Sequence, residues 1–182
     1  MSYKICKISD ISQEEYNLEY SLLSMSRKAH IDRMKIEQDK KRSLAATVLL
    51  KKLLSEMGVS ATLKTAENGR PYLADSNLFV SLSHSGEFVA CAVSEKRIGI
   101  DLEKLRPVKD ALINRVCTED EKAFVYSKSD PFAAFFEIWT AKEAYLKCFN
   151  CDTATALSTS MLKISKNTFY LDDLVVTIIE EA

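Results

Sequence analysis

Three carboxylates stand where a globular domain normally places apolar side chains, and they constrain this chain more than any other feature. Two lie in the segment Gly99-Ile100-Asp101-Leu102-Glu103, and the third, Glu143, lies much later, inside the apolar segment 139–147. A buried carboxylate without a partner is costly, so the fold has to pair it, protonate it or supply a cation. The chain is therefore expected to bring charged groups together at one place.

The residues from 98 to 103 are typical of a β-strand, because β-branched and apolar residues alternate with Gly99, Asp101 and Glu103. Side chains of a strand alternate between its two faces, so these three residues share one face. Two carboxylates on one face repel each other, whereas a hard cation such as Mg²⁺ requires such oxygen ligands. We expect Gly99, on the same face, to leave room for a ligand.

The segment from Pro131 to about Cys148 is predicted to be a helix, with Asp130 as its cap and Pro131 at the first helical position. Glu143 falls in the middle of its apolar stripe, and Lys147, one turn later, lies at the edge of the same stripe. A simple Glu143–Lys147 pair at the core edge remains an alternative to a functional site. The stripe consists of Phe132, Phe135, Phe136, Trp139 and Leu146.

Two halves of similar order are predicted, residues 1–95 and 96–182, without a linker or a short repeat. In the first half, Ser12 and Glu15 form a capping box, and a helix ending at Gly58 buries an apolar face. The predicted strands of this half lie near 60–66, 77–83 and 88–93, with a turn at Ser85-Gly86. The face of the helix consists of Leu44, Ala45, Val48, Leu49, Leu53 and Met57.

The second half begins with the strand at Ile98 and passes through a capping box at Thr118 and Glu121 to the helix after Asp130. Two further strands are predicted near 160–165 and 168–179. Helices and sheets thus occur in both halves, which indicates an α+β fold.

The composition is that of an ordinary globular protein. The 182 residues are 47% hydrophobic and 28% charged, and the net charge of -1 offers no electrostatic basis for binding nucleic acid. No apolar run is long enough to span a membrane, and the N-terminal residues do not resemble a signal peptide. Five scattered cysteines favour reduced thiols and a cytoplasmic location.

The two acidic segments, G-I-D-x-E and W-T-x-K-E-A-x-x-K, resemble the paired signature of the 4'-phosphopantetheinyl transferases. Upstream, Asn68-Gly69-Arg70-Pro71 and 81–86 are similar to two accessory motifs of the larger, Sfp-type branch. This resemblance implies two pseudo-symmetric α+β subdomains, each a small, mostly antiparallel sheet packed on a long helix. The active site is expected in the cleft between them. The second half looks shorter than in many members of this branch.

The resemblance also implies a reaction. Phosphopantetheine would pass from coenzyme A to a serine of an apo acyl or peptidyl carrier protein, with Mg²⁺ held by Asp101, Glu103 and Glu143. The catalytic residues would be Glu143 and Lys147, and whether Glu143 is the base or only a metal ligand stays open. The nucleotide end of coenzyme A would contact the first half, at Arg27, His30, Arg42, Arg70, Pro71, Ser83 and His84; Lys147 would also contact the coenzyme.

Alternative functions remain open at this point. A carboxylate set of this kind also occurs in metal-dependent nucleases and phosphoesterases, although such sites commonly use a late Asp or His, and both histidines here precede residue 85. A non-catalytic module that binds coenzyme A or a carrier protein is the other alternative. Because both halves lie in one chain, the resemblance favours a monomer.

Overall fold

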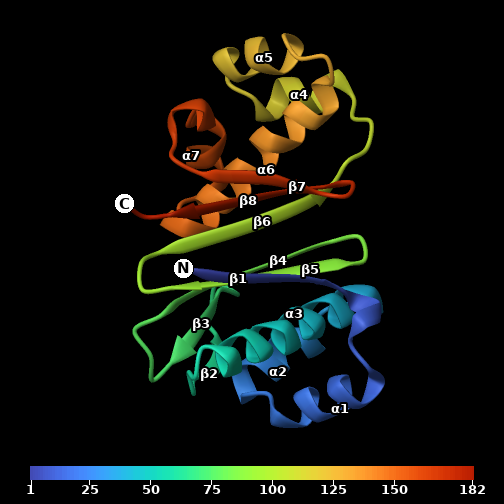
Figure 1. Cartoon of the computed structure of the whole chain (residues 1–182), viewed down its shortest axis with the longest axis vertical. Coiled ribbons are helices and arrows are strands. Elements are labelled where there is room, and N and C mark those ends of the chain that lie inside the picture. Colours follow the sequence, from blue (N-terminus) through green and yellow to red (C-terminus); the bar gives the residue numbers. More distant parts are fainter. The chain divides into compact units, whose positions relative to one another are not determined.

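The computed structural model describes all residues from 1 to 182, and the chain divides into two compact units, Met1–Lys96 and Arg97–Ala182 (Figure 1). Each unit combines helices with a small antiparallel sheet. The α+β class predicted from the sequence is therefore confirmed. None of the helices has both the length and the apolarity needed to cross a bilayer.

The first unit contains a three-stranded antiparallel sheet in the order β1-β5-β4 and a separate hairpin of β2 and β3. Its elements, in chain order, are β1 (Ser2–Lys7), the 3-10 helix η1 (Ile8–Asp10), α1 (Gln13–Leu22), α2 (Met25–Asp32), α3 (Glu37–Glu56), β2 (Thr62–Thr65), β3 (Pro71–Ala74), β4 (Phe79–Ser85) and β5 (Phe88–Ser94).

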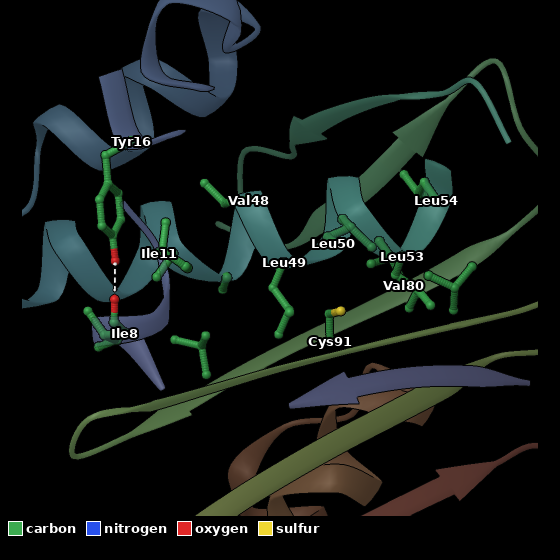
Figure 2. Packing of buried hydrophobic residues seen from close by; sticks show 14 of the residues in the cluster. Ile8, Ile11, Tyr16, Val48, Leu49, Leu50, Leu53, Leu54, Val80 and Cys91 are labelled. Atoms are coloured by element: carbon green, nitrogen blue, oxygen red, sulfur yellow. Dashed lines mark hydrogen bonds between the residues drawn. The ribbon is translucent and has the colours of Figure 1, made fainter. Parts of the chain in front are cut away.

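The core of the first unit lies between α3 and the sheet. Leu49 and Leu53 of α3 point toward Val80 of β4 and Cys91 of β5 (Figure 2). Tyr16 closes one end of this core, where its hydroxyl donates to the carbonyl oxygen of Ile8 at 3.3 Å. The apolar positions of α3 recur at helical spacing, which explains why this helix covers one face of the sheet.

The second unit contains one three-stranded antiparallel sheet in the order β6-β8-β7. Its elements are β6 (Ile98–Lys104), α4 (Asp110–Val116), α5 (Glu119–Tyr126), α6 (Pro131–Phe149), α7 (Thr153–Ser158), the 3-10 helix η2 (Met161–Lys163), β7 (Asn167–Leu171) and β8 (Leu174–Glu180).

The long helix α6 packs against β6 and β8. As predicted, it begins after Asp130, whose Oδ1 accepts hydrogen bonds from the amides of Phe132 and Ala133, both at 3.0 Å. It ends at Asn150, which adopts a left-handed conformation with φ of 52°. The helix therefore has the length and position to carry charged residues along the face of β6.

Both units have the same connectivity. In each, an edge strand (β1 or β6) precedes a long helix (α3 or α6), and a hairpin follows whose last strand (β5 or β8) occupies the centre of the sheet. This agreement supports the predicted pseudo-symmetry of the two halves. The predicted cleft between them stays a prediction.

Four details differ from the sequence prediction. The predicted strand at 160–165 is wrong, because Met161 is buried in the core of the second unit and the amide there bonds to Glu121 rather than to a strand. The segment 168–179 contains two strands that turn at Asp172, where φ is 53°. In the first unit, α3 ends before Met57, which is 36% exposed instead of buried. Strand β3 was not predicted, and it begins at Pro71, a position where a strand tolerates proline.

Candidate active site

Gly99 lies against the backbone of α6. A Cβ atom added at Gly99 would come within 1.9 Å of the carbonyl oxygen of Ala144 and within 2.8 Å of the amide nitrogen of Cys148. The expectation that Gly99 leaves room for a ligand is therefore wrong, because the helix itself fills that space. The same contact shows that the strand face shared by Gly99, Asp101 and Glu103 is the face that α6 covers.

Asp101 forms an ion pair with Lys147. The distance between Lys147 Nζ and Asp101 Oδ1 is 2.7 Å, and the same ammonium donates to the carbonyl oxygen of Ile100 at 3.0 Å. The Asp101 side chain is 9% exposed and that of Lys147 is 27% exposed. The structure thus brings together two residues that the sequence assigned to one site, one from β6 and one from α6.

Glu103 lies at the exposed end of the same strand face. Its Oε2 accepts a hydrogen bond from Arg106 at 3.1 Å, and the Arg106 guanidinium lies over the Phe136 ring at 5.0 Å from its centroid. Arg106 was not among the residues expected at the site. It immediately precedes Pro107 in an irregular segment, and nothing in the local pattern marks it.

Glu143 is half-buried, at the edge of the helix face that contacts the sheet rather than in its middle. The predicted stripe is correct in part: Phe135 and Phe136 are buried, but Phe132 is 40% exposed, and Ile138 and Ala141, which were not predicted, are buried too. Burial, followed by the nearby charges of Asp101 and Glu103, raises the pKa of Glu143, whereas Lys147 acts in the opposite direction. Glu143 is therefore close enough to Asp101 and Glu103 to be affected by both charges.

The chemistry of these residues fits a hard divalent cation, because all three are carboxylates and such an ion would relieve the repulsion of an ionised Glu143 by Asp101 and Glu103. Their side chains are not yet arranged for it. No group of three or more His, Cys, Asp or Glu side chains in the structure is placed to hold a metal ion, and Asp101 and Glu103 instead contact Lys147 and Arg106. Binding of a cation by all three would require their side chains to turn toward one point.

Lys142, which directly precedes Glu143, is a structural residue that the sequence pattern did not distinguish. It is 3% exposed and forms an ion pair of 2.9 Å with Glu121, which is fully buried. The Lys142 ammonium also donates to three carbonyl oxygens at the end of α7, those of Ala156, Leu157 and Thr159. A buried lysine so fully bonded fixes the α7 end against α6.

In the first unit, Arg27 is buried within a set of protein contacts. It is 3% exposed, and its guanidinium donates to Thr47 Oγ1, to the carbonyl oxygen of Ser43 and to Ser43 Oγ. Burial lowers the pKa of Arg27 to about 10. These contacts fix α2 to α3, and the predicted contact of Arg27 with coenzyme A stays a prediction.

His30 lies beside the turn between β2 and β3. Its Cε1 atom is 3.6 Å from the place where Gly69 would carry a Cβ, and φ of Gly69 is +85°, a value that favours glycine. Arg70 and Pro71 follow directly at the start of β3. The structure therefore brings these three predicted residues into one region of the first unit. Burial and the charges of Arg27 and Arg33 lower the pKa of His30.

Arg42 lies next to the turn between β4 and β5. Its Nε donates to the carbonyl oxygen of Gly86 at 3.0 Å, and its Nη1 contacts Asp39 at 2.9 Å. Ser83 and His84 are close to this turn in β4, where Ser83 is buried and His84 is exposed. Their alternation places them on opposite faces of the strand.

Each of the two units matches a model of a known protein family. Residues 97–174 match a family model described as the 4'-phosphopantetheinyl transferase superfamily, and residues 10–96 match one described as 4'-phosphopantetheinyl transferase, N-terminal. The chain belongs to the 4'-phosphopantetheinyl transferase superfamily. This membership confirms the resemblance identified from the acidic segments.

Several superfamily members are similar to most of the chain. The 4'-phosphopantetheinyl transferase psf-1 of Bacillus pumilus is 29% identical over 80% of this chain and 65% of its own length. Sfp of Bacillus subtilis is 28% identical over 80% of this chain and 68% of its own length. HetI of Nostoc sp. is 36% identical over 69% of this chain and 58% of its own length. The chain thus spans between 58% and 68% of the length of these curated relatives.

The raised pKa of Glu143 predicts how stability depends on pH. The folded chain keeps the Glu143 proton at pH values where the unfolded chain, with an ordinary value of 4.5, has lost it. This residue therefore destabilises the fold as pH rises from about 4.5 through its folded pKa. Because glutamine cannot ionise, Glu143→Gln should gain stability relative to the parent chain as pH increases.

Urea unfolding of both proteins in EDTA, from mildly acid to neutral pH, measures this difference. Glu119→Gln serves as the control, since the Glu119 side chain is 92% exposed. If plots of the free energy of unfolding against pH stay parallel for Glu143→Gln and the parent chain, the pKa of Glu143 is not raised by folding.

Proposed function

We propose that this chain transfers the 4'-phosphopantetheine group from coenzyme A to a serine hydroxyl of an apo acyl or peptidyl carrier protein, and that the reaction depends on Mg²⁺. The observation that carries the proposal is the 2.7 Å ion pair of Asp101 with Lys147 between β6 and α6, next to Glu143, whose pKa the charges of Asp101 and Glu103 help to raise. Membership of the superfamily supports the same reaction. An acidic cluster next to an ammonium suits a polyphosphate donor that binds together with a divalent cation.

For the donor, we assign the nucleotide end of coenzyme A to the first unit. The Arg42 guanidinium beside the turn at Gly86, and His30 beside the turn at Gly69, supply the cationic and hydrogen-bonding groups that phosphates require. Arg27 holds the helix that carries His30 and so contributes at least indirectly. The nucleotide end is also assigned to four further residues of this unit, Arg70, Pro71, Ser83 and His84.

For the chemistry, Asp101, Glu103 and Glu143 would hold Mg²⁺, which when bound supplies charge neutralisation for the diphosphate and its leaving group. Glu143 is the candidate proton acceptor for the carrier serine, because a carboxylate whose pKa is raised is a stronger base. Its roles as base and as metal ligand compete, since a carboxylate fully engaged by a cation accepts a proton poorly. Lys147 orients Asp101 and stabilises the phosphates of the donor.

The proposed setting is a monomer in the cytoplasm. Both units, with all the assigned residues, belong to one chain, and the five cysteines form no disulfide, which supports a reducing compartment. Neither a nucleic acid nor a membrane is part of the proposal.

The direct test is the transfer itself. The chain is incubated with coenzyme A, Mg²⁺ and an apo carrier protein, and mass spectrometry of the carrier should show the addition of one phosphopantetheine. Asp101→Asn removes a charge but almost no volume and should reduce the rate at least about a hundredfold. Glu119→Gln, an exposed carboxylate of the same unit, should leave the rate unchanged.

Three outcomes would count against the proposal. A carrier that stays unmodified while coenzyme A binds tightly would indicate a non-catalytic binding module. Hydrolysis of coenzyme A or of nucleic acid without transfer would indicate a phosphoesterase or nuclease. Full transfer by Asp101→Asn would remove Asp101 from the site.

A further inference from the structure

Three threonine hydroxyl groups form a continuous chain between α6 and the sheet of the second unit. Thr177 Oγ1 of β8 lies 2.7 Å from Thr140 Oγ1 of α6 and 3.0 Å from Thr168 Oγ1 of β7. Thr140 and Thr177 are fully buried. The proposed reaction uses none of the three residues, so the hydroxyl chain needs another explanation.

The direction of donation along this chain follows from counting protons. Thr140 Oγ1 lies 2.8 Å from the carbonyl oxygen of Phe136, which can only accept. Each hydroxyl has one proton, so Thr140 donates to Phe136, Thr177 donates to Thr140, and Thr168 donates to Thr177. This is the one order in which all three contacts contain a proton. The chain is therefore directional and ends at a carbonyl oxygen of α6.

The hydroxyl chain lies at the level of the acidic residues. Thr177 is the cross-strand partner of Asp101 in the pairing of β6 with β8. Directly opposed residues of neighbouring strands point to the same face, and this face is the one that α6 covers, as the contact of Gly99 with Ala144 shows. Thr140 precedes Glu143 by about one helical turn. The bond from Thr177 to Thr140 thus joins the strand next to Asp101 to the turn before Glu143.

The bond from Thr140 to Phe136 acts on the path of α6. A hydroxyl that donates to the carbonyl four residues earlier commonly bends a helix. The proton from Thr177 fixes the orientation of this hydroxyl, because Thr140 must then donate to carbonyl oxygens of its own helix, that of Phe136 at 2.8 Å and, more distantly, that of Glu137 at 3.4 Å. The position of the following turn, which carries Glu143, therefore depends on the hydroxyl chain.

We propose that Thr140 and Thr177 are positioning residues, which through their hydroxyl chain set the place of Glu143 relative to Asp101 and so the affinity of the site for a divalent cation. This inference rests on the proposed function for the identity of the metal ligands. Neither threonine touches the substrate or the cation. Thr168, at the start of the chain of donors, has a smaller effect because its loss leaves the bond from Thr177 to Thr140 intact.

Valine and serine substitutions in the full chain test this role. Thr140→Val and Thr177→Val keep the branched shape and remove the hydroxyl, whereas Thr140→Ser keeps the hydroxyl. Binding of Mn²⁺ in the presence of coenzyme A, followed by the loss of the free-ion electron paramagnetic resonance signal, is a readout that does not depend on turnover. Transfer rates and melting temperatures are measured on the same proteins.

Thr140→Val and Thr177→Val are expected to weaken Mn²⁺ binding about tenfold, as removal of groups that orient metal ligands usually does. Thr140→Ser, which keeps the hydroxyl, should bind Mn²⁺ within about twofold of the parent chain. Thr168→Val should weaken Mn²⁺ binding least among the valine variants. In the double variant Thr140→Val/Thr177→Val, neither hydroxyl of the pair is left facing a missing partner. It should bind Mn²⁺ no more weakly than either single variant, because both substitutions act through the same hydrogen bond.

A merely structural role would give a different pattern. Valine variants with lower melting temperatures but unchanged Mn²⁺ binding would overturn the proposal, and so would a Thr140→Ser variant as weak as Thr140→Val. If a single valine variant fails to fold, the double variant and the serine variant decide the question. Failure of the proposed function is recognised separately, since the parent chain would then neither bind Mn²⁺ with coenzyme A nor modify a carrier.

Discussion

Gly99→Ala is expected to lower the free energy of unfolding by about 3 kcal/mol, at the upper end of what overpacking usually costs. The added methyl group would lie 1.9 Å from the carbonyl oxygen of Ala144, and backbone atoms on both sides cannot turn away as a side chain can. Strand β6 and helix α6 must therefore separate. Urea unfolding monitored by circular dichroism measures the loss.

Gly58→Ala is the matched control, because the reason for glycine differs there. A Cβ at Gly58 meets nothing within 4 Å, but φ is +68°, so alanine should cost only about 1 kcal/mol of backbone strain. Equal losses for the two variants would show that close contact with α6 is not what requires Gly99. Because Glu143 and Lys147 lie on α6, the rate of the proposed transfer should also fall in Gly99→Ala, whereas it should not fall in Gly58→Ala.

Lys142→Met is expected to destabilise the chain by about 4 kcal/mol, because removal of one partner of a buried ion pair leaves the other charge without compensation. Glu121, fully buried, would lose its 2.9 Å contact with the ammonium, and three carbonyl oxygens near the end of α7 would lose their donor. The loss should appear as a lower midpoint of urea unfolding. In the absence of urea, the rate of the proposed transfer should stay that of the parent chain.

Lys147→Met is the natural comparison, since both lysines belong to the same short motif. The Lys147 side chain is 27% exposed, but Asp101, its partner, is 9% exposed, so replacement of Lys147 should cost about 2 kcal/mol, less than the loss of the fully buried Lys142 pair. The proposed transfer activity should instead be lost in Lys147→Met. A Lys147→Met variant that unfolds as readily as Lys142→Met, or a Lys142→Met variant with parental stability, would contradict this division of roles.

Much of the second unit was predictable from residues close together in the sequence. Asp130 and Pro131 mark the start of α6, and Thr118 with Glu121 marks that of α5, because capping groups bond to amides only a few residues away. Alternation along 98–103 likewise identified β6 and the face shared by Asp101 and Glu103. The prediction was weaker at 160–165, where apolar spacing resembles a strand but burial of Met161 against α5 and α6 decides the conformation.

The roles within the candidate site depended on tertiary contacts. Two lysines five residues apart look equivalent in the motif, yet Lys142 meets Glu121 in the core and Lys147 meets Asp101 at the site. Gly99 looked like space for a ligand and is the place where α6 touches β6.

The capped helices, the alternating strands, the order of the two halves and the set of charged residues can all be predicted from residue order, since these patterns arise from neighbours along the chain. The pairing of each carboxylate with Lys147 or Arg106, the choice of apolar residues that face the core, and the alignment of the threonine hydroxyls required the folded chain. Such contacts join residues far apart in the chain, and their energies depend on burial and distance, which local patterns do not contain.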